Sequence, residues 1–234
     1  MALPTDSSET FIREVEENYR RDRARDFFKT YGKWVIAGIV LFLGIVAGLI
    51  YWEEHSRKQS AEESVEMQKI FTDIGQGKTQ TVPQRLQALE KSGADATRAT
   101  AMLAEAAVAL EKNDRSTALG KYRAMSDDSG LPDAYRNLAT LRATALEFDT
   151  LKPEQVISRL EPLAKAGNPW FGTAGEMTAL ALLKQGKKPQ AGAMFAAVAA
   201  DKQVPGSIRS RAVQMAGSLG VDASASIPAL EQQD

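Results

Sequence analysis

The sequence has no cysteine and only one histidine, His55, among its 234 residues. Without cysteine it can form no disulfide bond, no thiol nucleophile and no thiolate metal site. A single histidine offers no pair of nitrogen ligands, and we interpret His55 as an interfacial polar residue just beyond an apolar segment. Only a metal site made of oxygen ligands is left open. We therefore predict no metal site and no cofactor.

Signatures of catalysis and of nucleic-acid binding are missing as well. The chain has no glycine-rich phosphate loop after a strand, no Gly-x-Ser-x-Gly motif and no nucleophile paired with a base. The acidic pair Asp127 and Asp128 lies in the turn sequence SDDSG, which is typical of a solvated loop. Lysine and arginine number 29 and the acidic residues 30, so no basic surface for nucleic acid is indicated. We predict that the protein is not an enzyme.

One long apolar run contrasts with the rest of the chain. Residues 34–52, WVIAGIVLFLGIVAGLIYW, contain no charged side chain. As a helix rising about 1.5 Å per residue they would reach roughly 28 Å, close to the ~30 Å hydrocarbon core of a bilayer. Trp34 lies at one end and Tyr51 with Trp52 at the other, as is favourable at membrane interfaces. We predict a transmembrane helix rather than a buried core helix.

The charges beside this run predict its orientation. Six basic residues lie between Tyr19 and Lys33, whereas residues 53–72 contain three. This excess of lysine and arginine holds the N-terminus in the cytoplasm. A cleaved signal peptide is disfavoured because the leader is long, the apolar run exceeds about 7–15 residues and no A-x-A-like site follows. We predict an uncleaved signal anchor with an exported C-terminal part.

Prolines recur in the C-terminal part at a nearly constant spacing. Pro132, Pro169 and Pro205 are 37 and 36 residues apart. Each unit contains an alanine- and leucine-rich helix, a short break and a second helix. The second helices share an apolar triplet at spacings of four and three: Ala118, Tyr122 and Met125; Val156, Leu160 and Leu163; Ala191, Phe195 and Val198. Such a period is typical of an α-solenoid, with an irregular helical bundle as the alternative.

These patterns divide the chain into five predicted segments. They are a cytoplasmic leader helix at 1–33, a transmembrane signal anchor at 34–52, a helical neck at 53–95, repeats with a C-terminal capping helix at 96–220, and a disordered tail at 221–234. In the neck, Val65, Met67, Ile70 and Phe71 are expected to supply apolar contacts. The predicted fold class is all-α, with one N-terminal transmembrane helix followed by the solenoid.

The leader, the anchor and the repeats together resemble a known family. The leader runs into the anchor through FFKTYGKW, residues 27–34, and the anchor ends in Tyr51 and Trp52. With the degenerate repeats, this arrangement is similar to the YfgM-like proteins, ancillary subunits of the bacterial Sec translocon. The resemblance implies that the solenoid is tetratricopeptide-like.

The tetratricopeptide pattern itself is matched unevenly. Its alanine and aromatic positions are occupied by Ala118 with Tyr122 and by Ala191 with Phe195. In the middle repeat, valine and leucine replace them. The resemblance implies a bacterial inner-membrane protein with a periplasmic C-terminal domain, whose partners are the Sec translocon and periplasmic chaperones or exported clients.

Two other classes of function are left open by the sequence. The protein could be a structural scaffold for envelope, cell-wall or division assembly, which only its partners would distinguish from a translocon subunit. An enzyme is the third class, and no motif favours it.

The resemblance and the span also suggest where partners bind. First helices normally line the inner face of tetratricopeptide-like stacks, which selects as partner-binding residues Leu103, Ala107, Leu138, Leu141, Phe148, Glu176 and Leu180. In the span, Gly44 and Gly48 form a G-x-x-x-G pair, which lets another helix approach closely. This predicts a lateral partner in the membrane, which includes a second copy of the chain in an oligomer through the transmembrane helix. The alternative is that the two glycines contact no partner, because glycine is common in membrane spans in general.

Overall fold

The computed structural model describes residues 6–226, with side-chain surroundings for Lys29, Lys33, Trp34 and 36–226. Every element in this described range is helical, from α1 (Asp6–Gly75) to the short 3-10 helix η1 (Ser224–Ser226), which confirms the all-α prediction. The chain divides into two compact units, Met1–Glu62 and Glu63–Asp234, and the boundary falls within α1.

In the first unit, α1 is apolar and exposed over the predicted span. Trp34 and Trp52 are 77% and 71% exposed, and most of the large apolar side chains described between Ile36 and Tyr51 are exposed as well. By length and composition, the part of α1 that begins at Ile36 is the one helix among the described residues that could cross a membrane. α1 also covers the predicted leader helix from Asp6 onward.

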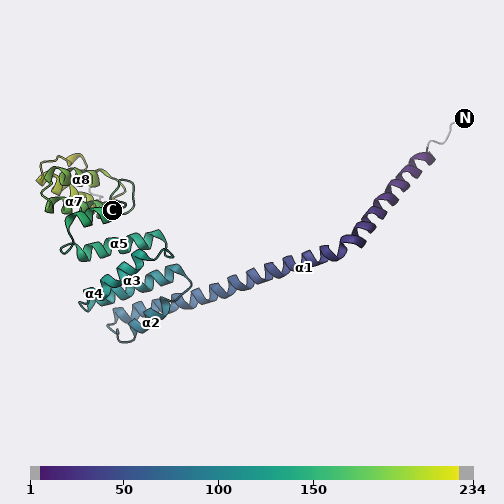
Figure 1. Cartoon of the computed structure of the whole chain (residues 1–234), viewed down its shortest axis with the longest axis horizontal. Coiled ribbons are helices and arrows are strands. Elements are labelled where there is room, and N and C mark those ends of the chain that lie inside the picture. Colours follow the sequence, from purple (N-terminus) through teal and green to yellow (C-terminus); the bar gives the residue numbers. More distant parts are fainter. Residues whose placement is uncertain (1–5, 227–234) are drawn as a thin grey trace, which may run out of the picture. The chain divides into compact units, whose positions relative to one another are not determined.

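The second unit consists of helices that pack against their neighbours in chain order (Figure 1). After the end of α1 they are α2 (Val82–Leu89), α3 (Asp95–Glu111), α4 (Arg115–Asp127), α5 (Asp133–Glu147), α6 (Pro153–Leu160), α7 (Phe171–Lys184), α8 (Lys188–Ala200) and α9 (Gly206–Ser218). The predicted pairs are thus α3 with α4, α5 with α6 and α7 with α8. They repeat as the proline spacing indicated.

The apolar triplets of the second helices form the centre of each pair. Tyr122 is 5% exposed, and Leu160 and Phe195 are fully buried. The remaining members of the three triplets are at most 4% exposed. In α4 and α8, spacings of four and three place the triplet on one face of the helix, which turns it to the neighbouring helices. In the middle pair α6 ends at Leu160, so Leu163 is buried from the turn that follows the helix. The predicted burial of these positions is confirmed.

In two of the pairs the first helix ends at a residue in the left-handed conformation. Asn113 follows α3 with φ 59°, and Gly186 follows α7 with φ 74°. The N–H of the next residue then donates to a carbonyl five residues back, at 2.8 and 3.0 Å. This is the Schellman arrangement, which asparagine and glycine tolerate better than residues with larger side chains. The predicted breaks therefore lie where the backbone can reverse.

The segment predicted as a neck joins the repeat core. Met67 and Ile70 on α1 are buried against Val82 and Leu86 on α2, and this cluster continues to Val108 on α3. The end of α1 and α2 therefore form another helix pair. This pair is hard to predict from the sequence because its first helix is the end of α1, so no proline marks where the helix begins.

The other end of the stack is covered by residues assigned to the predicted tail. Ala223 is buried in the cluster that contains Phe195 and Ala212. Arg209 on α9 donates to the carbonyl of Ser226 at 3.0 Å and to that of Ala199 at 2.9 Å. Residues 221–226 thus pack on α8 and α9, whereas the rest of the predicted tail, 227–234, lies outside the described residues.

Candidate protein-binding surface

The seven predicted partner-binding residues lie on the first helices or at their ends, but they differ in exposure. Ala107 on α3 is exposed, and Leu141 on α5 is only 4% exposed. The others are partly buried: Leu103, Leu138, Phe148, Glu176 and Leu180. Leu141 belongs to the apolar cluster that contains Val156 and Leu160, so it is a core residue and cannot contact a partner.

Helical spacing explains the error at Leu141. Leu138, Arg142 and Ala145 are spaced by four and three residues, so they share one face of α5, and the latter two are exposed. Leu141 is turned by about 100° from Arg142 and by about 60° from Leu138, so it lies at the edge of this face and not at its centre. That rotation directs it towards α6 and α7, where the cluster lies.

Phe148, at the end of α5, has a structural role. It packs against the cluster formed by α5, α6 and α7. The Lys184 ammonium lies 4.4 Å from the centre of its ring and pairs with Asp149 at 3.0 Å. Phe148 therefore anchors α5 to α7, and only part of its ring faces solvent.

Glu176 is likewise occupied by a contact within the domain. Its two carboxylate oxygens accept hydrogen bonds from Nε and Nη2 of Arg211 on α9, both at 2.8 Å. This bidentate pair links α7 to α9 and raises the pKa of the Arg211 guanidinium. A partner that uses Glu176 would have to share or displace Arg211.

Two clusters of charge connect adjacent repeats. Lys121 on α4 lies 2.7 Å from Glu90 at the end of α2 and 2.6 Å from Glu105 on α3. Glu147 on α5 contacts arginines on the helices before and after it, and the distance to Arg159 is 2.8 Å. Because each cluster holds three successive helices, both favour a defined packing of the repeats.

The pKa directions in these clusters follow from burial and partners. Burial, together with the neighbouring Glu105 carboxyl, raises the pKa of Glu90. Burial would also raise the pKa of Glu147, but hydrogen bonds from Arg159 and Arg123 outweigh it and hold that pKa below its usual value. Within the described residues, no group of three or more His, Asp or Glu side chains is arranged to hold a metal ion.

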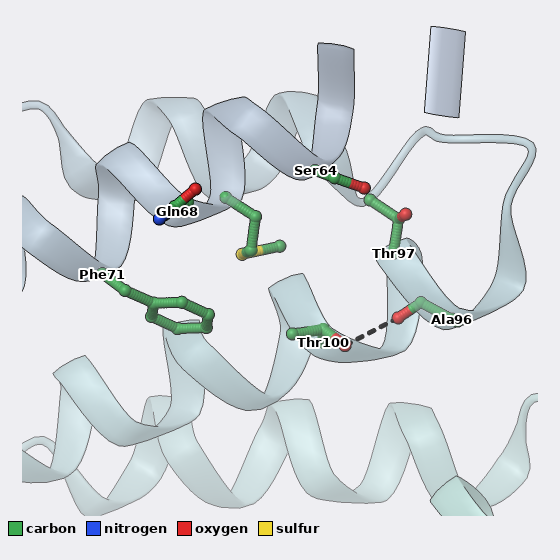
Figure 2. Close-up of a pocket in the computed structure, with 7 residues that line it drawn as sticks. Ser64, Gln68, Phe71, Ala96, Thr97 and Thr100 are labelled. Atoms are coloured by element: carbon green, nitrogen blue, oxygen red, sulfur yellow. Dashed lines mark hydrogen bonds between the residues drawn. The ribbon is translucent and has the colours of Figure 1, made fainter. Parts of the chain in front are cut away.

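The exposed face of α3 leads into a groove. Ala96, Thr100, Leu103 and Ala107 are spaced by four, three and four residues and therefore lie along one face of this helix. Beside the first two of them is a hollow of about 320 Å³ between α3 and the end of α1. We call it the α1–α3 groove. Its lining residues are Ser64, Met67, Gln68, Phe71, Ala96, Thr97 and Thr100 (Figure 2).

Comparison with known proteins places the chain in a family. A family model described as a tetratricopeptide repeat-like domain matches residues 25–216. The chain belongs to this family.

The tetratricopeptide repeat-like chain is also similar to two proteins named ancillary SecYEG translocon subunit. The protein from Haemophilus influenzae is 28% identical over 152 residues, which cover 62% of this chain and 71% of the relative. The protein from Escherichia coli K12 is 23% identical over 176 residues, which cover 74% of this chain and 82% of the relative. These similarities confirm the predicted resemblance to the YfgM-like proteins. No solved structure gives a significant match.

The residues matched by the tetratricopeptide repeat-like family include the part of α1 that lines the groove. This part of α1 is not among the predicted partner-binding residues. Met67 and Ile70 are buried, but Val65 and Phe71 are 51% and 49% exposed. The sequence held a signal for Val65 but not for Phe71. Met67, Ile70 and Ile74 are spaced as one helical face, and Val65 does not fit it. Phe71 follows Met67 by four residues and lies at the edge of the same face, so its exposure follows from the packing of the neighbouring helices.

Proposed function

We propose that this protein is an inner-membrane-anchored, helical-repeat subunit that associates with the Sec translocon and assists exported or envelope proteins. The observation that carries the proposal is the similarity to two ancillary SecYEG translocon subunits over 71% and 82% of their lengths. An exposed apolar helix followed by a repeat domain suits a tethered binding protein.

The proposed topology has the N-terminus in the cytoplasm and the repeat domain in the periplasm. The cluster of basic residues before Trp34 supports it through the excess of positive charge on the cytoplasmic side. A reporter that is active only outside the cytoplasm, fused after Asp234, is expected to be active. If it is silent while a cytoplasmic reporter works at the same position, the orientation is wrong.

The proposed partner surface is the exposed face of the first helices. Ala107 is its most accessible predicted member, while Leu103, Leu138 and Leu180 are partly buried. Periplasmic chaperones and exported clients are the partners we propose for this surface.

A photo-crosslinking amino acid placed at Ala107 tests this surface in the intact membrane. Ala197 on the second helix α8 is also an exposed alanine and serves as the matched control. We expect crosslinks from position 107 to translocon subunits, chaperones or exported proteins, and fewer from position 197. Crosslinks to cell-wall enzymes or division proteins would favour the alternative, a scaffold for envelope assembly. Equal crosslinking from both positions would remove the first-helix face as the binding surface.

A further inference from the structure

Two carboxylates share one ammonium group where α2, α3 and α4 meet. Nζ of Lys121 on α4 lies 2.7 and 2.9 Å from the two oxygens of Glu90, at the end of α2. The same atom lies 2.6 Å from Oε2 of Glu105 on α3. The three side chains are between 11% and 22% exposed. When both carboxyls are ionised, this partly buried cluster therefore carries one negative charge in excess.

One oxygen of the cluster lacks a hydrogen bond. Oε2 of Glu105 is buried and accepts none from any described residue, since the hydrogen bonds of the nearby Lys121 ammonium go to Glu90. A buried carboxylate oxygen without a donor is costly to the fold. The two carboxyls lie within hydrogen-bonding reach of each other, so a proton on Glu90 would supply the donor. The same proton would remove the excess charge.

We propose that Glu90, Glu105 and Lys121 form a proton-sensitive joint, in which uptake of one proton by the two carboxyls tightens the packing of α2 on α3 and α4. The inference goes beyond the proposed function and does not depend on it. α2 pairs with the end of α1, and α3 with α4 forms the next pair. The joint therefore lets pH control how firmly the first helix pair is held on the rest of the stack.

The neighbouring helices do not offset the second carboxylate. From α1, Glu63 accepts a hydrogen bond from Ser92, two residues after Glu90, and so brings another acidic group to this side. On α2, Gln87 contacts the Glu105 carboxyl and is uncharged. The other cations of these helices either bind other groups or are exposed to water: Arg85, Lys91, Arg98, Arg115 and Arg123. The excess charge is therefore removed by a proton.

The pKa directions agree with one shared proton. Burial and the Glu105 carboxyl raise the pKa of Glu90 despite the ammonium. Burial would also raise the pKa of Glu105, but the contacts with Glu90 and Lys121 outweigh it and lower that pKa. Ionised Glu90 thus destabilises the fold, and this cost disappears as the pH falls through its folded pKa towards the ordinary value of 4.5. The packing is therefore tightest in mild acid, between the two folded pKa values.

Spin labels on the intact protein test the inference. The chain has no cysteine, so cysteines introduced at two exposed alanines, Ala88 on α2 and Ala124 on α4, are labelled selectively. Pulsed electron paramagnetic resonance of the full chain in lipid nanodiscs measures the label-to-label distances from about pH 7.5 to about pH 4.5. We expect the distribution to narrow in mild acid, and the population outside the main peak to fall by roughly twofold or more.

Three substitutions distinguish a proton-sensitive joint from an ordinary ion pair. Glu90→Gln and Glu105→Gln each leave one carboxylate for the one ammonium. Both should therefore show the narrow distribution already at neutral pH and lose the pH response. Glu111→Gln removes an exposed carboxylate of α3 and is the matched control, which should respond like the wild type. Circular dichroism of each variant reports whether it is folded.

Several results would overturn the inference. They are a wild-type distribution that does not change over the pH range, a wild-type response in Glu90→Gln, and loss of the response in Glu111→Gln. If Glu90→Gln does not fold, its charge is required and not in excess, which contradicts the inference as well. Binding to SecYEG does not enter these measurements, so failure of the proposed function would leave their outcome unchanged.

Discussion

Glu147 carries a buried charge that links three helices of the repeat core. It is 7% exposed and contacts arginines on α4 and α6. Removal of the carboxylate leaves two guanidinium groups without their shared partner. We expect Glu147→Gln to lower the free energy of unfolding at neutral pH by about 1–3 kcal/mol. Urea denaturation of a fragment that begins at Glu53 measures this.

The same residue predicts a pH dependence. A folded-state pKa below the unfolded value means that the stabilisation is present above about pH 4.5 and is lost as the pH falls through the lower, folded pKa. The difference in stability between wild type and Glu147→Gln should therefore shrink in acid. The exposed Glu161, changed to Gln, is the control. A difference that stays constant from neutral pH into acid would contradict this account of Glu147.

Replacement of Phe148 tests whether this residue, predicted to bind partners, instead stabilises the domain. Because its ring packs on the α5–α6–α7 cluster and under Lys184, we expect Phe148→Ala to destabilise the domain. The ring is only partly buried, so the cost should be about 1–3 kcal/mol, less than the roughly 3–5 kcal/mol of a fully buried phenylalanine. Thermal unfolding measures it. An unchanged melting temperature together with weaker partner binding would instead make Phe148 a contact residue.

Among the elements, α7 and α8 pack so closely that glycine is required between them. A Cβ atom at Gly175 would lie 2.6 Å from Cγ2 of Val198. Gly120, within α4, has no atom near the corresponding position. We expect Gly175→Ala to destabilise the domain by about 1–3 kcal/mol through overpacking.

Gly120→Ala should have the opposite effect and raise the free energy of unfolding by about 0.5–1 kcal/mol, because alanine favours a helix and meets no neighbour there. Chemical denaturation of both variants measures the pair. If both substitutions stabilise the domain, helix propensity rather than the α7–α8 contact controls Gly175.

In the molecule as a whole, the apolar helix is the part that has no described neighbour to pack against. Apart from the helix's own nearby backbone and the adjoining residues, no atom lies within 4 Å of a Cβ built at Gly44 or Gly48. If these glycines contact a helix in the membrane, replacement of both by leucine should leave insertion intact and weaken co-purification with that partner. Gly38→Leu, in the same span but off this face, is the control. Unchanged co-purification would leave the glycine pair without a role in association.

Much of the architecture could be predicted from the sequence because it depends on local patterns. A charge-free run of membrane-spanning length is apparent from composition alone. The helix pairs could be found because prolines begin units, Asn113 and Gly186 allow the chain to reverse, and triplets such as that of Tyr122 fall on one face. Each of these signals lies within a few residues of the structure it specifies.

The exposure of the residues proposed to bind partners depends on contacts between distant segments, so only the tertiary structure decided it. Leu138 and Leu141 are both leucines on α5, and their different exposure follows from where α6 and α7 pack. The end of α1 belongs to the repeats because it packs on α2 and α3. The groove exists because α1 and α3 leave a hollow between them beside Phe71 and Thr100. By itself, the sequence determined a helical repeat preceded by one helix that is long and apolar enough to cross a membrane. Which of its apolar residues are available to partners was decided by packing, since exposure is a property of the neighbours and not of the residue.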